Sequence, residues 1–337
     1  MPFAFDQTAT CHACQARGTA CIQDTRVARI RNRNTQFRLL QSRMIGCCFE
    51  DFVPGTDNDP NPGRPFSAYM DQVSLNTVTA GQLIYGSDFA STVQQVGKVG
   101  GDTYETLEAA ALWNAATVWN NYMDTGQWKS TVLTPPADAV ATPTRKIAIV
   151  KLPRGYDATR LFNEKTRRDY LAFQVGLERS GMELRMSSPD IVGLRIPDPI
   201  PPGFAQFMHP LPNLGEANRK ILEEAHEGIV GMLDARNFLF AVAVKTSTRS
   251  DRLYQPLFEA TVLKFLIGYV LHGGAFRFHV HMGSFEGAAV ENRYRAASLT
   301  AILTGGAPTK AIDVTYRAIS PRDTAQLIID ELPSFPL

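Results

Sequence analysis

Residues 237–282 read NFLFAVAVKTSTRSDRLYQPLFEATVLKFLIGYVLHGGAFRFHVHM, and this stretch decides the fold. It begins with a run of apolar, β-branched and aromatic residues at 237–247, which predicts a buried strand. Residues 252–271 then predict a mostly buried helix, and residues 276–282 predict a second strand. A strand, a helix and another strand in this order are typical of a sheet that carries helices on its faces.

The same alternation continues on both sides of this stretch. Further strands are predicted at residues 146–153, 190–196 and 311–319, and further helices at about 103–122, after Asp157, near 215–234, at 294–303 and at 323–332. Residues 53–65 are dense in Pro, Gly, Asn and Asp, which predicts a long surface loop. We therefore expect an α/β protein with a central mixed sheet flanked by helices.

The composition argues against several classes of protein. The chain has 337 residues, of which 44% are hydrophobic, and this is enough for a substantial core. No run approaches the roughly 20 apolar residues of a membrane span, and the first residues lack a signal-peptide pattern, so we expect a cytoplasmic protein.

The five cysteines are odd in number and crowded near the start, which favours reduced thiols. Cys11, Cys14 and Cys21 lack the second ligand pair of a zinc finger, so zinc is not favoured.

Positive charge is concentrated in one segment, although the net charge of the chain is only +1. Between Asp24 and Glu50 there is no acidic residue, and this segment contains Arg26, Arg29, Arg31, Arg33, Arg38 and Arg43. Such a patch suits contacts with nucleic-acid phosphates, because each neutralised phosphate releases condensed counterions. The alternative is an ordinary solvated face.

Two polar residues stand at the ends of predicted strands. Asp190, which follows Pro189, opens the strand at 190–196, and Lys245 comes near the end of the strand at 237–247. On neighbouring strands the carboxylate could bind a hard cation while the ammonium faces a water or phosphate oxygen. Taken alone, such residues are more often ordinary solvated residues at chain reversals.

The segment that begins at Lys245 adds a specific resemblance. Residues 245–260, KTSTRSDRLYQPLFEA, resemble the type II restriction endonucleases that cut DNA around a CCGG core. The catalytic motif of that group combines a Pro-Asp pair, a distant lysine and a glutamate from the next helix. The matching residues here are Asp190, Lys245 and Glu259, and Ala243 stands where the usual PD-(D/E)XK pattern has an acid. The resemblance extends over most of the chain through residues 21–37, 98–105 and 111–120.

This resemblance implies a PD-(D/E)XK restriction-endonuclease-like fold and Mg²⁺-dependent cleavage of double-stranded DNA, with 5′-phosphate and 3′-hydroxyl products. It makes Asp190, Lys245 and Glu259 the catalytic residues, with Asp190 and Glu259 as metal ligands. It also places an acidic residue, Glu105, near the metal centre. Glu105 has an alternative interpretation, because Asp102 and Glu105 together resemble a capping box.

The resemblance further implies a palindromic recognition site with a CCGG core, extended to CRCCGGYG. A homodimer suits a palindrome because it has two identical reading surfaces, and the resemblance allows such dimers to assemble further on DNA. We expect a single endonuclease domain at residues 26–337 with a basic N-terminal arm, after a divergent segment at residues 1–25. Two alternatives are a catalytically silent DNA-binding protein of the same fold and a structure-specific repair nuclease.

Residues Arg249 to Arg252, with the sequence RSDR, are the predicted readers of DNA bases. The guanidinium groups of Arg249 and Arg252 fit guanine in the major groove, and Asp251 can accept a hydrogen bond from cytosine N4. The alternative is a charged turn that caps the helix.

Contacts with phosphates or flanking bases are predicted for three basic residues whose segments match the resembling enzymes: Arg31, Arg33 and Lys98.

His279 and His281 project to the same face of the strand at 276–282. They could hold a metal with a third ligand, but no such ligand is evident nearby. We therefore expect them to be packed or hydrogen-bonded in the core.

Overall fold

The computed structural model describes residues 22–24, 37–39, 41–85, 93–184, 188–246, 250–283, 294, 310–317 and 319–336. A mixed sheet of five strands forms its centre, in the order β3 (Ile147–Lys151), β4 (Ile191–Arg195), β5 (Phe238–Lys245), β6 (Arg277–Met282) and β7 (Val314–Arg317). β4 is antiparallel to both of its neighbours, β3 and β5, whereas β5, β6 and β7 run parallel to one another. The predicted mixed sheet is therefore confirmed, with each strand close to its predicted position.

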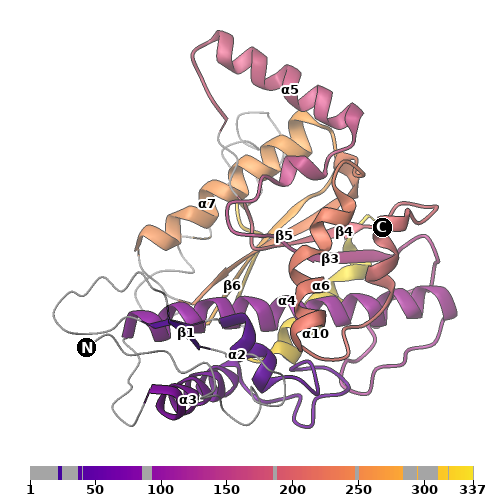
Figure 1. The fold of residues 1–337 in the computed structure, drawn as a ribbon. Helices are drawn as coiled ribbons and strands as arrows, with labels where there is room; N and C mark the ends of the chain where they lie inside the picture. Colours follow the sequence, from indigo (N-terminus) through magenta and orange to yellow (C-terminus); the bar gives the residue numbers. More distant parts are fainter. Residues whose placement is uncertain are drawn as a thin grey trace.

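Helices lie on both sides of this sheet. Figure 1 shows α4 (Val93–Thr125) along one side, and α7 (Ser250–Lys264) with its π-helical continuation Phe265–Val270 on the other. α5 (Glu164–Arg179) projects away from the sheet at the top of Figure 1. The remaining longer helices are α2 (Gln41–Cys48), α3 (Phe66–Tyr85), α6 (Glu216–Glu224) and α10 (Pro321–Glu331). None of the described helices is long and apolar enough to cross a membrane.

The short elements complete the described chain. A separate antiparallel pair consists of β1 (Ile22–Asp24) and β2 (Phe37–Leu39), which the sequence pattern did not predict. The 3₁₀ helices are Ala158–Leu161, Pro202–Met208, Ala225–Ile229, Ala235–Asn237 and Leu332–Ser334.

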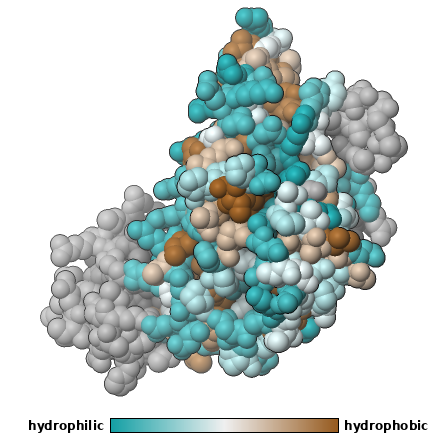
Figure 2. Space-filling model, turned by 90° about the vertical axis from the view of Figure 1, so that its right-hand side faces the viewer, coloured by the Kyte–Doolittle hydropathy of each residue, from teal (hydrophilic) through white to brown (hydrophobic). Residues whose placement is uncertain are grey.

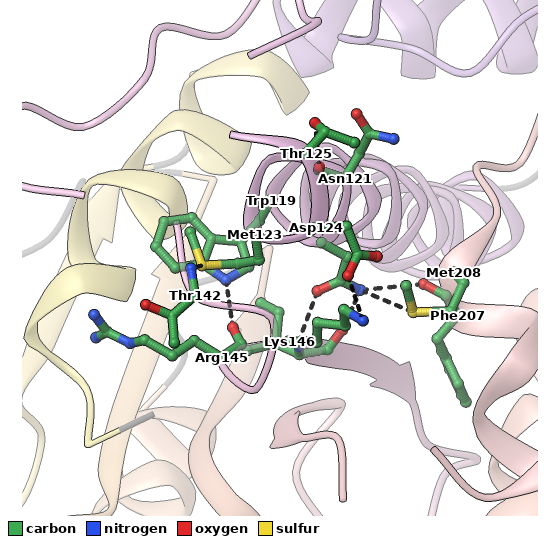
Figure 3. Close-up of polar contacts among 12 residues, drawn as sticks. Trp119, Asn121, Met123, Asp124, Thr125, Thr142, Arg145, Lys146, Phe207 and Met208 are labelled. Atoms are coloured by element: carbon green, nitrogen blue, oxygen red, sulfur yellow. Dashed lines mark hydrogen bonds and ion pairs between the residues drawn. The ribbon is translucent and has the colours of Figure 1, made fainter. Parts of the chain in front are cut away.

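The carboxyl-terminal half of α4 is fixed to the start of β3 by buried polar contacts. The Asn120 side chain donates to the Ile147 carbonyl at 2.7 Å and accepts from its amide at 2.8 Å. The fully buried Trp119 donates to the Arg145 carbonyl, as Figure 3 shows. Paired donors and acceptors make burial of these polar groups inexpensive, so the contacts set the position of the helix along the sheet.

One glycine in the sheet allows close packing. A Cβ added to Gly193 of β4 would lie 2.1 Å from the ring of Phe240 on β5, closer than any real contact. The register of the two strands shifts at this point, between Gly193 and Leu194. Glycine is therefore required here because the Phe240 ring occupies the space of a side chain.

Three sequence predictions need correction. The helix predicted at about 103–122 begins at Val93, so Asp102 and Glu105 lie inside α4 and cannot form a capping box, which requires the first turn. The segment 53–65 has no helix or strand, as predicted, but it is not wholly on the surface. Its Asp59 carboxylate is buried, and it accepts hydrogen bonds from the Gly55 amide and the Tyr69 hydroxyl.

The third correction concerns the helix predicted near 215–234. It is α6 followed by the 3₁₀ turn Ala225–Ile229, and the chain leaves helical structure after residue 229. The helix predicted at 294–303 lies outside the described residues, apart from Tyr294.

Candidate active site

The sheet topology brings Asp190 and Lys245 together. Because β4 and β5 are antiparallel, the start of β4 lies beside the end of β5. Asp190, immediately before β4, donates its backbone amide to the Val242 carbonyl at 3.1 Å, and Lys245 is the last residue of β5. The two strand-end residues singled out in the sequence are therefore neighbours at one edge of the sheet.

The Asp190 carboxylate is held by two donors. Its Oδ2 accepts from the Val244 amide at 2.6 Å and from the Lys245 ammonium at 3.2 Å. The Asp190 side chain is 23% exposed and that of Lys245 only 10%. Both hydrogen bonds use Oδ2, so Oδ1 receives none from the described part of the chain. A fixed carboxylate with one available oxygen is a suitable ligand for a hard cation.

Glu105 of α4 brings a second carboxylate to the same place. Burial raises the pKa of Glu105, the nearby Lys151 ammonium opposes this shift, and the negative charge of Asp190 adds to it. Lys151 Nζ lies 2.7 Å from Glu105 Oε1. Two carboxylates within electrostatic reach of each other are a donor set that a divalent cation can neutralise.

Contacts at two glycines show that α4 passes this edge. A Cβ added to Gly101 would be 3.7 Å from Thr246 Oγ1, just after β5, and one added to Gly283 would be 3.7 Å from the Tyr104 ring, just after β6. The amino-terminal half of α4 therefore crosses the carboxyl ends of β5 and β6. This crossing places Glu105, four residues after Gly101, at the edge that carries Asp190.

Glu259 has a different set of described contacts. It is 1% exposed on α7, and its Oε1 accepts from Gln255 Nε2 at 2.6 Å. Burial, together with the charge of Glu259, raises the pKa of Tyr294 to about 12. Among the described residues, no three His, Cys, Asp or Glu side chains converge closely enough to hold a metal ion. The metal-ligand role of Glu259 stays a prediction.

The environment of Ala243 agrees with the variant motif. This residue, two before Lys245, is fully buried in β5. Full burial disfavours a carboxylate there, which is consistent with a second acid supplied by another element.

Lys151 is a residue of this site that the sequence reasoning missed. It is the last residue of β3, and the next residue, Leu152, donates its amide to the Asp190 carbonyl at 2.9 Å. The signal that pointed to Lys245, a lysine at the end of an apolar strand, was also present in KIAIVKLP at residues 146–153. Its carboxylate partner was invisible because Glu105 belongs to a different element.

The predicted DNA-contact residues are described only in part. Arg31, Arg33 and Arg249 lie outside the described residues, as do Cys11, Cys14 and Cys21. The backbone of Asp251 and Arg252 forms the first turn of α7, and that of Lys98 lies in α4, but their side chains lie outside the description. Their roles remain predictions.

His279 and His281 are buried in the core, as predicted. Both side chains are 0% exposed, and His281 Nδ1 pairs with the equally buried Oε1 of Glu108. His279 Nε2 lies 3.2 Å from Glu331 Oε2 without the geometry of a hydrogen bond. Burial lowers the pKa of His279 well below its ordinary value, so this ring is neutral at pH 7.

Comparisons with known proteins agree with this architecture. The model of the protein family described as Cfr10I/Bse634I restriction endonuclease matches residues 53–333 of this chain. A solved structure of Bse634I restriction endonuclease has a TM-score of 0.72 at 17% identity, covering 91% of this chain and 96% of that one. The crystal structure of type IIF restriction endonuclease Bse634I with cognate DNA has a TM-score of 0.73 at 17% identity, covering 93% and 97%. No curated protein sequence matches the chain.

The matched range spans most of the chain, and Asp190 and Lys245 fall within it. The five-stranded mixed sheet and its flanking helices are the restriction-endonuclease-like fold of the two solved structures. The chain therefore belongs to the Cfr10I/Bse634I family and is a type II restriction endonuclease, a site-specific deoxyribonuclease.

Proposed function

We propose that this enzyme uses Mg²⁺ to cut both strands of DNA at a palindromic site with a CCGG core. The observation that carries the proposal is the contact of Asp190 with Lys245 beside the Glu105 carboxyl, in a member of a restriction endonuclease family. The CCGG core rests on the resemblance of residues 245–260 to the CCGG-cutting group. The resemblance to SgrAI, a member of that group, supports CRCCGGYG as the full site.

The side chains at the sheet edge fit a hard divalent cation, because their donors are carboxylate oxygens. Asp190 would hold it together with Glu259, the ligand expected from the motif, and Glu105 offers a further carboxylate. When bound, Mg²⁺ supplies positive charge to the scissile phosphate and lowers the pKa of water.

Lys245 supplies a positive charge from the protein itself. Its ammonium is fixed at Asp190 Oδ2 and is mostly buried, so its charge is directed to the place where a phosphate next to Asp190 would lie. Negative charge that develops on this phosphate during cleavage is stabilised by such a preorganised cation. The products would carry 5′-phosphate and 3′-hydroxyl ends.

We further propose a homodimer, since a palindrome presents the same bases twice. Exposed apolar side chains on α5 and α7 and in the π-helical segment support an interface there: Leu171, Val175, Tyr254, Phe258 and Tyr269. Figure 2 shows hydrophobic residues among polar ones on the projecting part of the molecule. Further assembly of dimers on DNA, and a cytoplasmic location with the DNA substrate, belong to the same proposal.

Digestion of phage DNA of known sequence tests the function directly. With Mg²⁺ we expect discrete bands, and sequencing of the new ends should find CCGG at every cut. Chelation of the metal with EDTA should stop the reaction. A smear would instead indicate a nuclease that reads DNA structure, and intact DNA would indicate a catalytically silent DNA-binding protein.

Replacing Arg252 by Lys should separate base reading from general DNA affinity. Lysine keeps the charge but loses the planar pair of donors that fits guanine. We expect a loss of about 1 to 3 kcal/mol of discrimination at the contacted base, with nonspecific binding nearly unchanged. The measurement is competition in Ca²⁺ between a CCGG duplex and a duplex with one altered core pair. Arg236→Lys is the control, because the exposed Arg236 lies just before the opposite end of β5. Full preference for CCGG in Arg252→Lys would show that the readout segment is misassigned.

A further inference from the structure

The candidate site contains a lysine that the catalytic motif does not require. Lys151 ends β3 at the same edge of the sheet where β4 begins and β5 ends. Its Nζ lies 2.7 Å from Glu105 Oε1, and its side chain is only 14% exposed. A lysine paired at this distance and largely shielded from water is held in place at the site.

Two ion pairs lie at this edge. Asp190 is paired with Lys245, and Glu105 is paired with Lys151. A divalent cation between Asp190 and Glu105 would lie close to the Lys151 ammonium, and a cation that binds Glu105 Oε1 has to displace this ammonium. Like charges in a partly buried site repel strongly, because water screens them poorly.

We propose that Lys151 is a positioning residue that occupies the Glu105 carboxylate and competes with the divalent cation for it. The inference rests on the proposed function of the same site. Lys151 holds Glu105 in place beside Asp190 and keeps cation affinity low. Removal of the Lys151 charge therefore strengthens metal binding. If Lys151 only supported the Glu105 side chain, its removal would leave metal binding unchanged or weaken it.

The size of the effect follows from Coulomb's law. A unit positive charge about 6 Å from a divalent cation weakens its binding about tenfold, even with the dielectric constant of water. Partial burial of both side chains increases this factor. Lys151→Met removes the charge and keeps an unbranched side chain of similar length. We therefore expect this variant to bind the metal at least about tenfold more tightly.

The experiment is a titration of the DNA-free protein with Mn²⁺. Binding is monitored by electron paramagnetic resonance, because the signal of the free ion decreases when the ion binds. Lys151→Met should bind more tightly than the wild type, and Lys151→Arg, which retains the charge, should restore wild-type affinity. Lys129→Met is the matched control, because Lys129 is exposed and follows the carboxyl-terminal end of α4, whereas Glu105 lies in the amino-terminal half of that helix. This variant should leave metal affinity unchanged. Circular dichroism establishes that each variant is folded.

The outcomes separate this inference from the proposed function. Binding that is lost in Asp190→Asn and tightened in Lys151→Met supports both. Binding that depends on Asp190 but is unchanged or weaker in Lys151→Met overturns the role of Lys151 alone. Binding in the wild type that does not depend on Asp190 overturns the metal site itself, and the inference with it.

Discussion

Asp190→Asn is expected to abolish DNA cleavage in Mg²⁺ while specific DNA binding in Ca²⁺ is retained. The substitution keeps the shape of the side chain, and the amide oxygen can still accept from the Val244 amide, so the strand end keeps its structure. It removes the charge that would bind the metal and that pairs with Lys245. A bound cation contributes several kcal/mol to such reactions, so we expect a rate loss of at least about a thousandfold.

The measurement is single-turnover cleavage of a CCGG-containing duplex, combined with a binding titration of the same duplex in Ca²⁺. Asp138→Asn is a suitable control because Asp138 is exposed in the loop before β3. Lys245→Ala should lose cleavage as well, and a loss of affinity alone would make Lys245 a phosphate anchor. Cleavage by Asp190→Asn at the normal rate would refute the assignment of the metal site.

His281→Leu is expected to destabilise the protein by about 3 to 5 kcal/mol, the usual cost of breaking a buried pair by removing one partner. Glu108 and His281 are both 0% exposed, and Oε2 of Glu108 has no hydrogen-bond partner among the described residues. Without His281 the Glu108 side chain would stay buried without its partner. Glu108 is one helical turn from Glu105, so this pair also supports the part of α4 that carries the site residue.

Urea denaturation at pH 7 measures this effect. The double variant Glu108→Leu/His281→Leu should be more stable than His281→Leu, because apolar side chains of similar size can replace a buried polar pair at little cost. His209→Leu serves as control, since the His209 side chain is exposed. A His281→Leu variant within about 1 kcal/mol of the wild type would mean that the buried pair contributes little to stability.

The sequence by itself determined the strands of the sheet and most of the helices that cover it. The apolar runs at residues 146–153, 190–196 and 237–247 are local patterns, and each became a strand within two residues of its predicted ends. The same runs marked Asp190 and Lys245, because a polar residue at the end of an apolar run is visible without knowledge of any partner.

Only the tertiary structure decided which side chains meet. Glu105 and Lys151 come from a helix and a strand, and Glu108 and His281 are 173 positions apart in the chain. The full length of α4 was also hidden, because packing against the sheet stabilises helical residues that local propensity does not favour. Periodicity records which face of an element is apolar, whereas strand order and helix crossing depend on contacts between segments that are distant in the sequence.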